Sequence, residues 1–135
     1  MSSGFHTNEL LKSLSRYPVS KGDVAGHYFH GNQYVSASNQ ASEARNLADA
    51  VKSGSADHFT AQDQHRNIAR ALEEASKAAS DNGLKRIANA YAKAAQAHRD
   101  AAAAHTNYLS SKVDAIGASE KAAQASEKAD ELAYS

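Results

Sequence analysis

The sequence has no cysteine and no tryptophan, and its 135 residues include one proline and one methionine. The absence of cysteine excludes disulfides and cysteine-based catalytic or metal sites. The formal net charge is zero, with 15 basic and 15 acidic residues. Because no basic block stands out, we expect no nucleic-acid partner. No apolar run reaches the roughly 18 residues of a membrane span, and the first residues lack a secretory-signal pattern, so we expect no membrane partner.

Large apolar side chains are also scarce, since Leu, Ile, Val and Phe total 19 residues whereas Ala alone totals 30. Thick β-sandwich, barrel and doubly wound cores need many branched and aromatic residues, so these folds are excluded. Alanine is the best helix former and allows helices to approach closely. We therefore predict an all-α fold, an antiparallel Ala-rich helical hairpin or bundle with an irregular N-terminal arm. Burial of alanine contributes little free energy, so we also expect a homo-oligomer.

The composition divides the chain into an arm, residues 1–36, and a helical bundle, residues 37–135. The arm holds the only proline, four of the seven glycines and five of the nine aromatic residues. Within it, a short helix is expected before Pro18, followed by an irregular segment from Val19 to Ser36. Such a segment cannot bury its own aromatic side chains, so we expect it to pack against another protein surface.

The rest of the chain shows apolar residues at spacings of three and four, which is typical of amphipathic helices. Turn signals lie at residues 53–55 and 80–83, and Gly117 is expected to break or bend the helical pattern. The final segment repeats a heptad, with SEKAAQA at 119–125 followed by SEKADEL at 126–132. The predicted helices cover residues 39–52, 57–79, 84–116 and 119–133.

Four of the seven histidines fall on two helices that should pack antiparallel around the turn at 80–83. If Ala79 lies opposite Leu84, then His65 faces His98 and His58 faces His105. The two pairs are seven residues apart, or about 10.5 Å along a helix, so one metal ion cannot bridge them.

Three interpretations of the facing histidines remain open. The sequence favours neutral imidazoles that hydrogen-bond across the seam. The second is a metal site completed by another chain or a nearby acid. The third is a pH response, since imidazole titrates near pH 6.5. The metal candidates are His58, His65, His98 and His105, and we expect no cofactor.

No catalytic motif is visible in the sequence. It contains no Gly-rich phosphate loop, no nucleophile elbow and no kinase signature. Asp, Ser and His are present, but their spacing supports no triad. We therefore expect that the protein is not an enzyme.

The most distinctive segment runs from residue 23 to residue 34, DVAGHYFHGNQY. It places two glycine-punctuated turns around an aromatic cluster, and Gly31-Asn32 suits a turn with positive φ. Aromatic and amide side chains of this kind supply strong contacts at interfaces. Two interpretations stand: a clip on a partner or neighbouring subunit, and an arm folded against its own bundle. The candidate partner-binding residues are Gly26, His27, Tyr28, Phe29, Gly31, Asn32, Gln33 and Tyr34.

This segment resembles a short Gly-His-x-Phe-x-Gly-Asn-Gln-Tyr/Trp stretch that recurs in tailed-bacteriophage head and virion-associated proteins. The resemblance covers about a dozen residues. It implies a non-enzymatic structural component of a phage particle, of the minor head, capsid-associated or decoration type. The arm would grip the capsid or another virion protein, and the location would be the virion, assembled in the host cytoplasm. The alternative is a His-rich helical binding protein that responds to metal or pH.

Overall fold

The computed structural model describes residues 27–30, 33–107 and 114–133 of the chain. This part of the chain forms an alanine-rich helical bundle preceded by a small β-hairpin, so the predicted all-α fold class is confirmed. The elements are β1 (His27–His30), β2 (Gln33–Ser36), α3 (Ala37–Ser53), α4 (His58–Asp81), α5 (Lys85–Thr106) and α7 (Ala115–Ala133).

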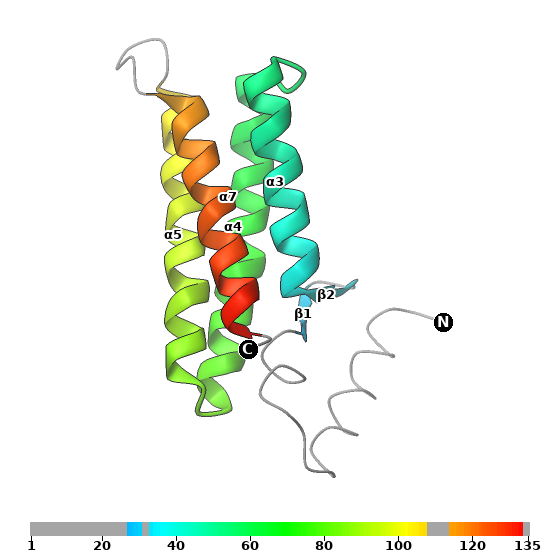
Figure 1. Cartoon of the computed structure of the whole chain (residues 1–135), viewed down its shortest axis with the longest axis vertical. Helices are drawn as coiled ribbons and strands as arrows, with labels where there is room; N and C mark the ends of the chain where they lie inside the picture. Colours follow the sequence, from blue (N-terminus) through cyan, green and yellow to red (C-terminus); the bar gives the residue numbers. More distant parts are fainter. Residues whose placement is uncertain (1–26, 31–32, 108–113, 134–135) are drawn as a thin grey trace.

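Successive helices run in alternating directions and lie side by side as a four-helix bundle (Figure 1). In the ring of helices, α4 packs against α3 and α5, and α7 packs against α5 and α3. The contact between α4 and α5 is the most extensive, whereas the one between α3 and α4 is the least extensive of these four. Because α7 closes the ring, it presents side chains to the core of the α4–α5 pair and to α3.

Alanine lets the backbones of α4 and α5 come close together. Ser76 Oγ on α4 donates a hydrogen bond to the main-chain oxygen of Ala88 on α5, at 2.8 Å. The largest fully buried apolar side chains of these helices are Leu72 and Tyr91, which are 1% and 0% exposed. A core of small residues around a few large ones follows the alternation expected for close helix packing. The buried alanines of the pair are Ala61, Ala69, Ala71, Ala75, Ala79, Ala88, Ala94, Ala95, Ala101, Ala102 and Ala104.

Both ends of α4 carry capping hydrogen bonds, and the helix runs from His58 to Asp81 where residues 57–79 were predicted. Asp57 precedes the helix, and its carboxylate accepts a hydrogen bond from the Thr60 main-chain N–H at 2.6 Å. At the other end, Asn82 is the C-cap and its N–H donates to Ala79 O at 3.1 Å. Gly83 then takes a left-handed conformation with φ of 76°. The turn predicted at residues 80–83 is therefore confirmed, with glycine in the position where other residues are strained.

The predicted single helix over residues 84–116 is wrong, because α5 ends at Thr106. Two side chains add hydrogen bonds to carbonyl oxygens of the last helical turn, where the Asn107 main-chain N–H also donates to Ala103 O. Thr106 Oγ1 donates to Ala102 O at 2.9 Å, and Asn107 Nδ2 donates to Ala103 O at 2.9 Å. The apolar periodicity of the sequence concealed this local stop signal.

The predicted helix start at residue 119 and the predicted break at Gly117 are also wrong, since α7 begins at Ala115 and includes Gly117. Asp114 Oδ1 accepts a hydrogen bond from the Gly117 main-chain N–H at 2.8 Å, which is the geometry of an N-cap. A Cβ atom at Gly117 would lie 2.3 Å from Asp114 Oδ2. Glycine is therefore compatible with the first turn here, because it leaves space for the capping carboxylate.

Residues 27–36, expected to be irregular, instead contain the antiparallel β1–β2 hairpin at the base of α3 (Figure 1). The register pairs Phe29 with Tyr34 and Tyr28 with Val35, and aromatic and β-branched residues favour strands. The strands are separated by Gly31 and Asn32, a short connection suited to a hairpin. The turn expected at these two residues and the helix expected before Pro18 lie outside the described residues.

An ion-pair cluster joins α3 to α7. Arg45 Nη1 lies 2.7 Å from Glu120 Oε1, and Arg45 Nη2 lies 2.7 Å from Glu127 Oε1. Glu120 and Glu127 occupy the same place in the two heptads. Arg45 holds the pKa of the Glu120 carboxyl below its usual value, chiefly through this hydrogen bond. The repeat therefore gives α7 an acidic edge that one arginine of α3 binds twice.

Candidate functional site

Both predicted pairs of facing histidines are confirmed. His65 Nδ1 on α4 lies 2.8 Å from His98 Nδ1 on α5, and His58 Nδ1 lies 2.8 Å from His105 Nδ1. The ring centroids are 5.0 Å apart in each pair. Since seven residues make nearly two helical turns, both pairs lie along the same seam between antiparallel helices.

Two serines of α7, which the sequence analysis did not single out, connect these pairs. Ser119 Oγ lies 2.8 Å from His65 Nε2 and 2.9 Å from His105 Nε2. Ser126 Oγ lies 2.8 Å from His98 Nε2. The serines are 0% and 2% exposed. A signal for them was present, because the heptad repeat spaces the two serines by the same seven residues that separate the histidines on each helix.

The hydrogen bonds therefore run without interruption through the bundle core. His65 and His105, from different pairs, are linked through Ser119 and their ring centroids lie 5.7 Å apart. We call this network the histidine–serine chain. In order, its members are His58, His105, Ser119, His65, His98 and Ser126.

Burial keeps the inner rings of the chain neutral. Burial lowers the pKa of His65 to about 3, with smaller contributions from the nearby His98 and His105 rings. Burial also lowers the pKa of His98 to about 4. The pKa of His105 is lowered by burial and then by His58. No solvent reaches His65 or His98, since both are 0% exposed. A charged imidazolium would lose its hydration there without a counter-ion.

The chemistry of Ser126 fixes the direction of all hydrogen bonds in the neutral chain. Its buried hydroxyl has one hydrogen-bond partner within the described structure, His98 Nε2, so a satisfied O–H must donate to that nitrogen. A neutral imidazole has one donor and one acceptor nitrogen. His98 therefore donates from Nδ1 to His65, which donates from Nε2 to Ser119. We assign each tautomer from this hydrogen-bond pattern.

The same reasoning gives the directions of the remaining hydrogen bonds, from Ser119 to His58. Ser119 accepts from His65, so its own hydroxyl donates to His105 Nε2. His105 in turn donates from Nδ1 to His58 Nδ1, which leaves the N–H of His58 on Nε2. Every buried donor and acceptor of the histidine–serine chain then has a hydrogen-bond partner. The hydrogen bonds run from the buried Ser126 at one end to His58 at the other, and His58 is half-buried and lies next to the surface.

As arranged, the histidine pairs do not fit a metal ion between them. Two nitrogens that ligate one tetrahedral zinc ion lie about 3.3 Å apart or more, given bonds of about 2.1 Å. The facing Nδ1 atoms are 2.8 Å apart, which is a hydrogen-bond distance. Among the residues described, no group of three or more His, Asp or Glu side chains could hold a metal ion.

Ser119 and His65 resemble a nucleophile and its base in distance alone. The Oγ to Nε2 separation of 2.8 Å meets the requirement for such a pair. However, Ser119 and His65 are both 0% exposed, and the remaining bond of Ser119 goes to another imidazole. No substrate can reach this hydroxyl while the bundle is closed.

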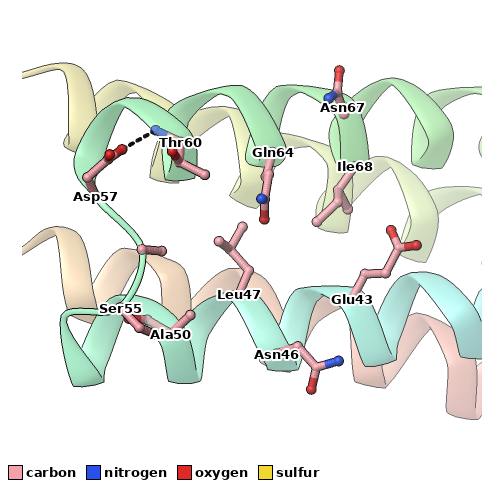
Figure 2. Close-up of a pocket in the computed structure, with 11 residues that line it drawn as sticks. Glu43, Asn46, Leu47, Ala50, Ser55, Asp57, Thr60, Gln64, Asn67 and Ile68 are labelled. Atoms are coloured by element: carbon pink, nitrogen blue, oxygen red, sulfur yellow. Dashed lines mark hydrogen bonds between the residues drawn. The ribbon is translucent and has the colours of Figure 1, made fainter.

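The weakly packed seam between α3 and α4 forms an open groove of about 590 Å³. Figure 2 shows Leu47 of α3 and Ile68 of α4 pointing into the groove, with Gln64 beside them. The hydrogen bond between Asp57 and Thr60 lies at one end of the groove. No lysine, arginine or histidine lines this groove, so its lining offers no cation for an acidic ligand.

The predicted partner-binding segment contributes the backbone of the hairpin. Residues 27–30 and 33–34 lie in β1 and β2, whereas Gly26, Gly31 and Asn32 lie outside the described residues. Close by in sequence, Gln40 of α3 is 5% exposed, and its Oε1 has no hydrogen-bond partner within the described structure. A buried amide oxygen without a donor costs about 1–3 kcal/mol. The base of the bundle therefore carries an unsatisfied acceptor close in sequence to the hairpin.

Comparison of the chain with protein-family models, with curated proteins and with solved structures finds no match in any of the three. Within the described residues, no helix has the length and apolar character needed to cross a membrane. The function must therefore be argued from the hairpin, the unsatisfied Gln40 oxygen and the histidine–serine chain.

Proposed function

We propose that the protein is a non-enzymatic structural component of a bacteriophage particle, attached through its N-terminal arm to the capsid or another virion protein. The observation that carries the proposal is the β1–β2 hairpin, since the segment that resembles phage head proteins forms it. A two-stranded hairpin is marginally stable alone and leaves main-chain donors and acceptors at its outer edges. A strand of a partner can add to such an edge.

The Gln40 side chain adds support at the same end of the bundle. Its buried Oε1 needs a donor that the described residues do not supply. A partner that displaces the groups covering this buried oxygen would satisfy it with an N–H or O–H group. Attachment would then involve both the hairpin and the first turn of α3, next to which the hairpin ends.

We further propose that copies of the chain associate with one another in the particle. The large apolar side chains exposed among the described residues are Phe59 and Ile116, at 81% and 47%. They lie near the starts of α4 and α7, at the end of the bundle away from the hairpin (Figure 1). Exposed apolar groups of this size favour self-association. Sedimentation equilibrium of the purified chain tests this, and a monomer at all concentrations would contradict it.

The attachment proposal predicts a large effect of substitutions in the hairpin. We expect Phe29→Ala or Tyr28→Ala to reduce the amount of chain in purified phage particles roughly tenfold or more, because aromatic anchors dominate interface energy. The helical content of the purified variant, measured by circular dichroism, should stay unchanged. Particle content is measured by quantitative mass spectrometry relative to the major capsid protein.

Lys93→Ala is the control, since it removes an exposed side chain of α5 that belongs neither to the hairpin nor to the exposed apolar pair of Phe59 and Ile116. We expect this variant to attach to particles as the unmodified chain does. Unchanged attachment of both hairpin variants, or absence of the chain from the particles, would contradict the proposal.

A further inference from the structure

We propose that the histidine–serine chain makes the bundle proton-responsive. The bundle is closed while the imidazoles of the histidine–serine chain are neutral, and the bundle opens cooperatively as these imidazoles take up protons in mild acid. The proposal does not depend on the attachment described above. It rests on the five hydrogen bonds that link six buried or half-buried groups of three helices.

A first added proton already disturbs the closed chain. A charged imidazolium donates from both of its nitrogens, so all hydrogen bonds must point away from it on both sides. Wherever the charge lies, Ser126 then has to accept from His98 instead of donating to it. The Ser126 hydroxyl, 2% exposed, is left without an acceptor within the described structure. No ring of the chain can therefore be charged while every buried group remains satisfied.

A second proton on the same facing pair of histidines breaks the hydrogen bond between their Nδ1 atoms. Both Nδ1 atoms would then carry hydrogens while lying 2.8 Å apart, as in the pair of His65 and His98. Two like charges would also face each other across the α4–α5 seam, which is the most extensive contact of the bundle. Protonation therefore opposes the packing of α4 against α5.

The charged groups near the histidine–serine chain do not neutralise a proton on its inner rings. On α4, Asp57 interacts electrostatically with the half-buried His58 that follows it, and its carboxylate caps the helix through Thr60. On α7, Glu120 and Glu127 each follow a serine of the chain, and both bind Arg45 of α3. On α5, the electrostatic neighbours of the inner rings are the other histidines. The inner rings therefore have no carboxylate as a hydrogen-bond partner.

The sign of the pH effect follows from the lowered pKa values. In the unfolded chain each imidazole binds a proton below about pH 6.5. In the closed bundle, the pKa is about 3 for His65, about 4 for His98, and lowered for His105. The stability of the neutral chain is thus complete above about pH 6.5 and is lost as the pH falls toward the folded pKa values. His65 and His98 each lower the folding equilibrium constant about tenfold per pH unit in this window, and His105 acts in the same direction.

Carboxyl groups change the stability of the bundle at lower pH than the histidines do. The pKa values of Asp57 and Glu120 are lowered by their hydrogen bonds to Thr60 and Arg45, so they also favour folding until they are protonated. Unfolded carboxyl groups bind protons near pH 4, about two units below imidazole. A loss of stability between about pH 6.5 and 5 therefore reports the histidines.

The test is urea unfolding of the full chain, followed by circular dichroism at intervals from pH 7.5 to 5. For the unmodified protein we expect the folding constant to fall steeply, approaching a hundredfold or more per pH unit, because His65 and His98 each contribute about tenfold and His105 acts in the same direction. The combined variant His65→Leu, His98→Leu and Ser126→Ala removes the inner half of the histidine–serine chain without leaving Ser126 unpaired. We expect its dependence on pH to be weaker by about a hundredfold per pH unit. The control His6→Gln, at a histidine that is not a member of the histidine–serine chain, should keep the steep dependence.

Retention of the full pH dependence in the combined variant would overturn the proposal. If that variant does not fold, the number of protons that the unmodified protein binds on unfolding tests the proposal instead. Calorimetric unfolding at pH 5.5 in buffers of different ionisation enthalpy measures the protons bound on unfolding. We expect about two or more, because His65 and His98 each contribute close to one proton at this pH, and about one or fewer would overturn the proposal.

Discussion

Ser119→Ala is expected to destabilise the bundle by about 2–5 kcal/mol, measured as the free energy of urea unfolding at pH 7.5. The substitution removes one oxygen atom, so the lost volume is small. It leaves His65 Nε2–H without an acceptor and His105 Nε2 without a donor, and both residues are buried. Each unsatisfied buried group costs about 1–3 kcal/mol.

Ser126→Ala is the matched control for Ser119→Ala. Both serines belong to α7, occupy the same heptad position and are buried. Ser126 ends the chain, so its removal leaves only the acceptor His98 Nε2 unsatisfied. We expect it to cost about half as much as Ser119→Ala. Equal effects of the two substitutions, or none from either, would show that the chain is not a connected network.

Gln40→Met is expected to have opposite effects on the isolated chain and on the attached chain. In isolation the substitution removes a buried oxygen that has no donor within the described structure. The free energy of unfolding should therefore rise by about 1–3 kcal/mol. In the particle the same substitution removes an acceptor that the partner binds, so the amount of attached chain should fall.

The stability and the attachment of Gln40→Met together show whether the partner or another part of the same chain donates to this oxygen. Greater stability together with weaker attachment supports a donor from the partner. Lower stability of the isolated chain would show that another part of the same chain supplies the donor, which contradicts this role of Gln40. Asn39, the exposed neighbour in the same turn of α3, provides the matched substitution Asn39→Met.

The seam between α4 and α5 was predictable because one turn fixes its register. Once residues 80–83 are identified as a tight turn, helical geometry alone places His65 against His98 and His58 against His105, as the structure shows. The position of α7 was not predictable in this way. It depends on the capped ends at Asn107 and Asp114. These local hydrogen bonds end one helix and begin the next within a stretch whose apolar periodicity suggested continuity.

The serines were missed because a serine in an alanine-rich helix resembles a surface residue. The repeat that contains them was recognised, yet its match to the histidine spacing becomes clear only when α7 packs against α5 and Ser119 reaches His65 of α4. The hairpin was missed for a related reason. Glycine at residues 26 and 31 suggested irregular backbone, whereas the intervening aromatic residues form a strand. In each case a tertiary or cross-strand contact determined the outcome.

The most direct test of the histidine–serine chain is ¹⁵N NMR of the imidazole nitrogens at pH 7.5, which distinguishes a protonated from an unprotonated ring nitrogen. We expect all four rings of the chain to be neutral with alternating tautomers. The hydrogen should lie on Nδ1 in His98 and His105, and on Nε2 in His65 and His58. The same tautomer at His65 and His98, or a charged ring at this pH, would contradict the assigned chain, because one facing Nδ1 must donate and the other must accept.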